Sequence, residues 1–303
     1  MKKTTKILCL ILVLSLFALM AMGSGSSSSS SSTTPITSSS NSSSSSSAST
    51  PEKKVELPTI EEQVILDQDG VKVTAKEYVN DSFWGDGIKL LIENNSSKNL
   101  GVGCNALIVN NYMISDLFSS TIAAGKKSNE TLYISSTGLK EAGISNIGQI
   151  EVYFHIFDGD TYMTISDAPC AVIKTSDYDK MDTTPNDAGQ ELYNEGGIRI
   201  VGKYLADDPI WGKGVLLFMQ NDSGKNVGIS CDNMSVNGFM VTPLFSCTVY
   251  NGKMAIDDIT LLSSELEENG ITEVEEVELI FHIFDADSYM TITDSAPITF
   301  STK

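Results

Sequence analysis

The chain has 303 residues and a formal net charge of −19, from 39 acidic and 20 basic side chains. This charge repels nucleic-acid phosphates and anionic lipid head groups, so nucleic acid and a membrane surface are disfavoured as partners. Without an N-terminal export signal and a serine-rich segment, about 250 residues remain, which is the length of two ordinary domains.

The N-terminal segment predicts export. Lysines within the first six residues precede an apolar run over residues 7–20, and the run ends on the small-residue pattern of residues 21–23. This is the pattern of a secretory signal peptide, and the run is shorter than the about 20 residues of a membrane span. We expect residues 1–23 to be cleaved, leaving no integral membrane span, with a retained membrane helix as the alternative. A lipid anchor is not expected, because Cys9 lies inside the apolar run.

A serine- and threonine-rich segment follows the signal peptide. Residues 24–56 cannot bury enough apolar surface to offset the entropy of ordering, so a disordered linker is predicted. A spacer that lifts the folded part away from a surface is the simplest interpretation, and O-glycosylation is the alternative. Together with the signal peptide, this segment predicts a secreted, extracellular or cell-envelope protein.

The main feature of the remaining chain is an internal duplication. A shift of 127 positions aligns residues 69–167 with residues 196–294 without a gap, and about 39 of the 99 aligned pairs are identical. The predicted domains are repeat 1 at 57–175 and repeat 2 at 191–303, joined by a polar linker at 176–190. A period as long as a domain predicts two independently packed bodies.

Each repeat is predicted to be rich in β-strands. Apolar residues mostly alternate, and the continuous apolar runs at 88–92 and 215–219 are typical of central strands. Asn110-Asn111 and Asn237-Gly238 fit type I′ hairpin turns, in which both central residues have positive φ. The predicted fold class is all-β, with two tandem antiparallel immunoglobulin-like β-sandwich domains.

One short helix is expected in each repeat. Ser136 and Ser264 are the expected N-terminal caps, and Gly143 and Gly270 stand where a residue that ends a helix belongs. With this helix, the pattern resembles a repeat found in exported proteins of anaerobic Gram-positive bacteria. The segments that carry the resemblance are Asn99 to Asn110, Leu117-Phe118-Ser119, Gly125-Lys126, Glu141-x-Gly143-Ile144 and Phe154-His155-Ile156-Phe157-Asp158-x-Asp160. The resemblance implies export and an immunoglobulin-like fold, and it implies no activity.

The chain contains two histidines, and they occupy equivalent positions in the repeats. His155 and His282 are therefore single imidazoles in their domains, which argues against a zinc site with two histidine ligands. Strand periodicity places each ring on the face opposite the core. A recognition patch or a general base is one interpretation, and a packed histidine that orients the next turn is the other. A general base without a nucleophile does not make a hydrolase.

Carboxylates cluster after each histidine, and oxygen ligands of this kind suit Ca²⁺. The candidate calcium ligands are Asp158, Asp160 and Asp167 in repeat 1, and Asp285, Asp287 and Asp294 in repeat 2. The alternative is that these aspartates accept hydrogen bonds from their own turns. Ca²⁺ is the one cofactor that the sequence brings into consideration.

Trp84 and Trp211 each precede a glycine at a turn between strands. A sugar ring could stack on an indole there, although a lone tryptophan in a small sandwich more often belongs to the core. The cysteines outside the signal peptide do not repeat as matched pairs, so free thiols are expected rather than disulfides.

These observations favour a non-enzymatic interaction module for an unknown protein or glycan partner. Two sites on one chain would gain apparent affinity for a multivalent partner. One alternative is a carbohydrate-binding module that uses Trp84 and Trp211. The other is a hydrolase centred on His155 or His282.

Overall fold

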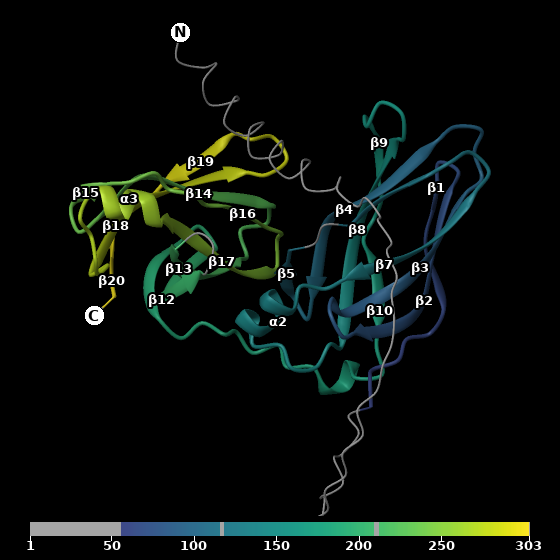
Figure 1. Ribbon diagram of the computed structural model, residues 1–303, viewed down its shortest axis with the longest axis horizontal. Helices are drawn as coiled ribbons and strands as arrows, with labels where there is room; N and C mark the ends of the chain where they lie inside the picture. The colour runs from purple at the N-terminus through teal and green to yellow at the C-terminus, as the bar shows by residue number, and fades with distance from the viewer. Residues whose placement is uncertain (1–55, 116–117, 209–211, 303) are drawn as a thin grey trace, which may run out of the picture. The chain divides into compact units, whose positions relative to one another are not determined.

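The computed structural model describes residues 56–115, 118–208 and 212–302 (Figure 1). The predicted signal peptide at 1–23, all but the last residue of the predicted linker at 24–56, and Trp211 lie outside the described residues. Among the residues that the structure describes, no helix is long and apolar enough to cross a membrane.

The described chain is mostly β-strand, as predicted. Repeat 1 contains β1 Gln63–Gln68, β2 Val71–Asp81, β3 Gly85–Asn94, β4 Leu100–Val109, β5 Tyr112–Ile114, β6 Ser119–Ile122, β7 Lys127–Tyr133, α2 Ser136–Ala142, β8 Gln149–Asp158, β9 Thr164–Asp167 and β10 Ala171–Lys174. A 3₁₀ turn, η2 Tyr178–Lys180, follows. Repeat 2 contains β11 Gln190–Glu195, β12 Ile198–Asp208, β13 Gly212–Asn221, β14 Val227–Val236, β15 Phe239–Met240, β16 Ser246–Val249, β17 Lys253–Leu262, α3 Ser263–Glu268, β18 Glu276–Asp285, β19 Thr291–Asp294 and β20 Ile298–Ser301.

Each repeat is a sandwich of antiparallel sheets. In repeat 1, the sheet β1-β2-β3-β7 packs against a sheet built on β4 and β8, and in repeat 2 the strands β11, β12, β13 and β17 pack against a sheet built on β14 and β18. The predicted central strands at 88–92 and 215–219 lie in β3 and β13, each paired on both sides. The all-β fold with two tandem immunoglobulin-like sandwiches and one short helix in each is therefore confirmed.

Each repeat has a hydrophobic core of its own, and the two repeats also meet through one strand pairing. Strand β5 of repeat 1 pairs in parallel with β17 of repeat 2, through Tyr112 opposite Met254 and Met113 opposite Ala255. This pairing joins one sheet of each repeat into a single sheet of ten strands. The short strand β5 leaves a free edge on the hairpin, and pairing satisfies backbone groups that an edge strand leaves open.

The duplicated turn signals are confirmed in both repeats. Asn110 and Asn111 have φ values of 47° and 71°, and Asn237 and Gly238 have values of 50° and 82°, as a type I′ turn requires. The side chain of Asn110 also donates to the carbonyl of Asn146 and accepts the backbone N–H groups of Gly148 and Gln149. The asparagine therefore holds the hairpin against the start of β8.

The helix boundaries are partly as predicted. Ser135, one residue before the expected Ser136, caps α2 by accepting the N–H of Gly138. Ser264 lies inside α3 and does not cap it, because β17 ends at Leu262 and leads directly into the helix. Gly143 and Gly270 follow the helices with positive φ, as expected.

Candidate functional site

The β2–β3 turn of repeat 1 places two large rings in solvent. The Oδ1 atom of Asp81 accepts the backbone N–H groups of Phe83 and Trp84 at 2.8 and 2.9 Å. These bonds lower the pKa of the Asp81 carboxyl, with the bond from Trp84 as the largest cause. Gly85 has a φ of 81° and lets the chain turn back into β3. The turn therefore fixes the backbone and points both side chains away from the core.

Trp84 is exposed, so the expectation of a core tryptophan is wrong for this residue. Its exposed fraction is 60% and that of Phe83 is 80%. The two rings meet edge to face with centroids 4.8 Å apart, and Trp84 lies 5.8 Å from the ring of Tyr133 on β7. The core beside this turn is instead built by Ile88, Leu90 and Ile92 of β3, which are buried.

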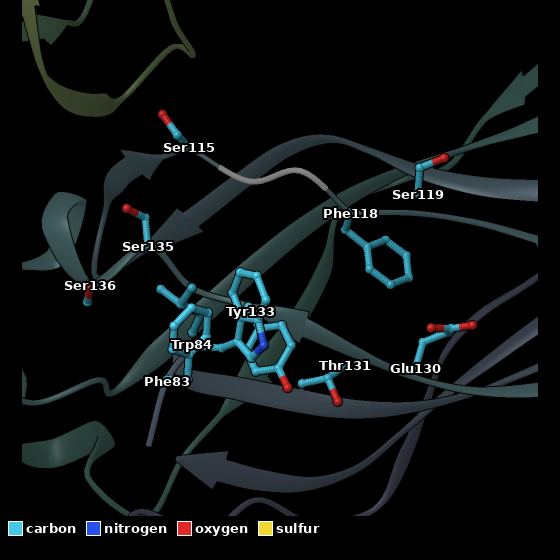
Figure 2. A pocket seen from close by; sticks show the side chains of 11 residues that line it. Phe83, Trp84, Ser115, Phe118, Ser119, Glu130, Thr131, Tyr133, Ser135 and Ser136 are labelled. Atoms are coloured by element: carbon cyan, nitrogen blue, oxygen red, sulfur yellow. The ribbon is translucent and has the colours of Figure 1, made fainter. Parts of the chain in front are cut away.

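The three rings border an open groove with a volume of about 510 Å³. Figure 2 shows Phe83, Trp84 and Tyr133 gathered together, with Phe118 and Glu130 on the other side and Thr131 between. Ser115, Ser119, Ser135 and Ser136 add hydroxyl groups around the rim. A groove with an aromatic wall and a border of hydroxyl and carboxylate groups can stack an apolar ring face and hydrogen-bond its polar edge.

Glu130 is the one carboxylate in the lining of this groove, and it is held in place by two serine hydroxyls. Its Oε1 atom accepts the hydroxyl of Ser120 at 2.9 Å and the hydroxyl of Ser128 at 2.6 Å. A carboxylate fixed in this way keeps one orientation, so a ligand would not have to order it on binding.

Repeat 2 differs at the corresponding place. Thr260 replaces Tyr133, and its backbone N–H donates to the carbonyl of Leu244 at 3.1 Å. Thr242 donates from both its backbone and its hydroxyl to the carboxylate of Glu265 on α3. These bonds tie the segment before β16 to β17 and α3.

A second exposed apolar feature occurs in both repeats, at the tip of the hairpins β8–β9 and β18–β19. Tyr162 and Met163 are 73% and 72% exposed, and Tyr289 and Met290 are 80% and 70% exposed. Ile165 and Ile292 next to them are also exposed. Sequence analysis missed this feature, although the identity of Tyr-Met-Thr-Ile in the two copies was a usable signal.

The tyrosines at these tips adopt an unusual backbone conformation. Tyr162 and Tyr289 have φ values of 60° and 57°, which bulky side chains rarely adopt. Each ring stacks near a phenylalanine of the preceding strand, with centroids 6.0 Å apart for Phe157 and 6.2 Å apart for Phe284. The same strained turn is therefore built twice.

The two histidines lie beside these phenylalanines in different settings. His282 Nδ1 lies 2.5 Å from Asp294 Oδ1. In repeat 1, Asp167 instead accepts the side chain of Asn105, and His155 Nδ1 is buried without a hydrogen-bond partner among the described residues. His155 lies over Gly103, where an added Cβ would stand 2.3 Å from its ring. The histidine–aspartate pair is thus present in one repeat and not in the other.

The aspartates after the histidines bond to their own turns. Asp158 Oδ1 accepts the backbone N–H and the hydroxyl of Thr161 and the N–H of Asp160. Asp285 makes the matching bonds to Ser288 and Asp287 and also accepts Lys225. These bonds lower the pKa of Asp158 and bring that of Asp285 to about 2, with the backbone N–H of Ser288 as its largest cause.

The structure does not gather the three candidate calcium ligands of either repeat into one site. Asp160 accepts a hydrogen bond from the side chain of Asn99. Asp167 on β9 and Asp294 on β19 are the strand partners of His155 and His282. Within the described ranges, no group of three histidine, cysteine, aspartate or glutamate residues could hold a metal ion. Cys170, Cys231 and Cys247 are free thiols, as expected.

Comparison with known proteins leaves the function open. No family model and no curated protein matches the chain. The chain is similar to the Salmonella enterica SafA pilin in complex with the SafB chaperone, at 13% identity over 71% of this chain and 88% of that chain, with a TM-score of 0.20. A protein of unknown function from Porphyromonas gingivalis W83 gives 10% identity over 68% of this chain and 89% of that chain, with a TM-score of 0.19. Likenesses at these TM-scores say nothing about a ligand.

Proposed function

We propose that this chain is a non-enzymatic binding module of the cell exterior or envelope, and that it binds carbohydrate in the groove beside Trp84. The observation that carries the proposal is the exposure of Trp84 together with Phe83 at the edge of that groove. Exposing two large rings costs solvation free energy, which a ligand that covers them would recover. Membership of the exported Gram-positive repeat family is part of the same proposal.

The chemistry of the groove favours a sugar over an extended apolar ligand. Aromatic rings can stack on the C–H face of a pyranose, while Thr131, Glu130 and the serines can hydrogen-bond its hydroxyl groups. The groove has a volume of about 510 Å³, and we propose that it accepts part of a longer sugar chain. The net charge of −19 favours neutral or cationic glycans over anionic ones.

A glycan array probed with the exported protein tests this proposal. Binding that Trp84→Ala abolishes and Tyr204→Ala preserves would support it, because Tyr204 is an exposed aromatic residue of repeat 2 outside the groove. Binding that survives Trp84→Ala would contradict it. The contribution of Trp211 is measured in the same way with Trp211→Ala.

A protein partner is the second candidate, and the duplicated hairpin tips favour it. Tyr162-Met163 and Tyr289-Met290 are exposed, identical and strained in the same way, although core positions differ between the repeats. If binding to a candidate protein partner, measured by surface plasmon resonance, is lost in the double variant Tyr162→Ser with Tyr289→Ser and persists in Trp84→Ala, the hairpins are the binding surface for that partner; binding that survives the double variant would contradict this candidate.

A hydrolase centred on His155 or His282 fits the geometry less well. Among the described residues, His282 pairs with Asp294, whereas His155 Nδ1 is buried without a hydrogen-bond partner. A base without a positioned nucleophile supplies only part of an active site.

A further inference from the structure

The junction of the two repeats brings together a lysine, an asparagine and a glutamate. Lys253 Nζ, at the start of β17, lies 2.6 Å from Oε1 of Glu151 on β8 and 3.3 Å from Oδ1 of Asn111 in the β4–β5 turn. Exposed fractions are 17% for the lysine side chain and 9% for the glutamate side chain. An amine, a carboxamide and a carboxylate therefore meet in a place that is largely closed to water.

We propose that Lys253 and Asn111 form an intramolecular amide bond, with Glu151 as the acid–base group. Glu151 takes a proton from the Lys253 ammonium, and the free Nζ attacks Cγ of Asn111. The Nζ–Cγ bond forms and the Cγ–Nδ2 bond breaks, while Glu151 passes its proton to the leaving nitrogen and then carries a second proton from Nζ to it. The products are a secondary amide and an ammonium ion, Glu151 ends as a carboxylate, and no oxidation or reduction takes place.

The surrounding backbone holds the reacting groups at close range. The N–H of Met254 donates to the carbonyl of Asn111 at 2.9 Å, and the next residues pair β5 with β17. Asn111 is further fixed by its place in the type I′ turn. Such positioning replaces an encounter in solution with a contact at reactive distance, which raises the rate of amide formation by a large factor.

Glu151 is also positioned by its neighbours. Gln149 donates to its Oε1 atom at 2.9 Å, and the Sγ atom of Cys170 lies 3.8 Å from Oε2. Tyr153, on the same face of β8, meets Tyr250 edge to face with centroids 4.9 Å apart. A carboxylate held at hydrogen-bond distance from the Lys253 amine is well placed to accept and return a proton.

The counterparts of these three residues in the other repeat are of a different type or have different surroundings. Gly238 stands where repeat 1 has Asn111, and Glu278, the counterpart of Glu151, accepts the hydroxyl of Ser235. Lys126, the counterpart of Lys253, is exposed. The bond would therefore link the two repeats to each other, with Asn111 and Glu151 from repeat 1 and Lys253 from repeat 2.

Peptide mass spectrometry of the full chain tests the bond directly. Trypsin does not cleave after an acylated lysine, so residues 226–253 are expected to stay joined to 254–303 and to carry the peptide 99–126 as a branch. The branched product should be lighter than the sum of its parts by one ammonia for the new bond. Lys126→Arg, the matched control, should give the same branched product.

Variants of the bonded residues test the bond itself, and a variant of Glu151 tests its acid–base role. Lys253→Arg and Asn111→Ala should each give residues 99–126 and 226–253 as separate peptides. Glu151→Gln, with its fold checked by circular dichroism, should do the same because the proton acceptor is gone. Separate peptides from the unmodified chain would overturn the proposal. A branched product from Glu151→Gln would overturn the role of Glu151.

Discussion

Repeat 1 and repeat 2 are alike at their hairpin tips and unlike beside their first turn. Both expose the same tyrosine and methionine, whereas repeat 1 places Tyr133 and Phe83 along a groove and repeat 2 has Thr260 and Ile210 at these positions. Thr260 also hydrogen-bonds to the segment before β16. The hairpin tips are therefore the same in the two repeats, whereas the residues beside the first turn differ. This difference fits separate functions for the two surfaces.

The junction supplies the largest expected effect. Lys253→Met prevents the proposed bond and leaves Glu151 as a buried carboxylate without the lysine that pairs with it before the bond forms, and breaking a pair of this kind costs about 3–5 kcal/mol of unfolding free energy. Lys126→Met in repeat 1 removes an exposed lysine and should change stability by less than about 0.5 kcal/mol. Urea unfolding monitored by circular dichroism measures both. Equal effects would contradict the asymmetry of the junction.

One substitution in repeat 1 should give His155 surroundings like those of His282. Gly103→Ser copies Ser230 of repeat 2, and its Cβ would stand 2.3 Å from the His155 ring. We expect the ring to move toward Asp167 and the unfolding free energy to fall by about 1–3 kcal/mol from overpacking. Imidazole NMR resonances of His155 report the movement. Unchanged resonances with unchanged stability would show that Gly103 does not set the position of the ring.

Asp257 makes stability depend on pH. Burial is the main cause that raises its pKa from 3.8 to about 6. A folded-state pKa above the unfolded value means that the folded protein holds the proton more tightly. The stabilising contribution is therefore complete below about pH 4 and is lost as the pH rises through about 6.

Asp257→Asn should remove this dependence. The amide oxygen can still accept the N–H of Asp258, which now bonds to Oδ1 of Asp257. The variant should gain roughly 1–3 kcal/mol at pH 7.5 relative to the parent and much less at pH 4, in thermal or urea unfolding. A gain of the same size at both pH values would contradict the cause assigned to the shift.

The smallest expected effect is that of calcium. Asp158 and Asp285 are engaged in matching turns, so adding Ca²⁺ or a chelator should leave the unfolding temperature unchanged. Differential scanning calorimetry of the full chain measures this. A rise that disappears in Asp158→Asn with Asp285→Asn would instead make the turns metal sites.

Sequence patterns predicted the fold better than the site, for physical reasons. Strand alternation and the Asn237-Gly238 turn report local backbone preferences, and these held. The exposure of Trp84 and the pairing of β5 with β17 depend on tertiary packing and on which strand edge is left open, and neither is encoded locally. Tyr133 was missed because its counterpart is Thr260, so the duplication did not single it out.

The binding of carbohydrate beside Trp84 is tested most directly by the fluorescence of that indole. In a Trp211→Phe background, Trp84 is the only tryptophan of the chain. Titration with the glycans that bind on the array should change its emission saturably, with the same affinity as direct binding, because the sugar displaces water from an indole that is 60% exposed. Glycans that bind while the emission of Trp84 stays constant would place the binding site elsewhere and contradict the account.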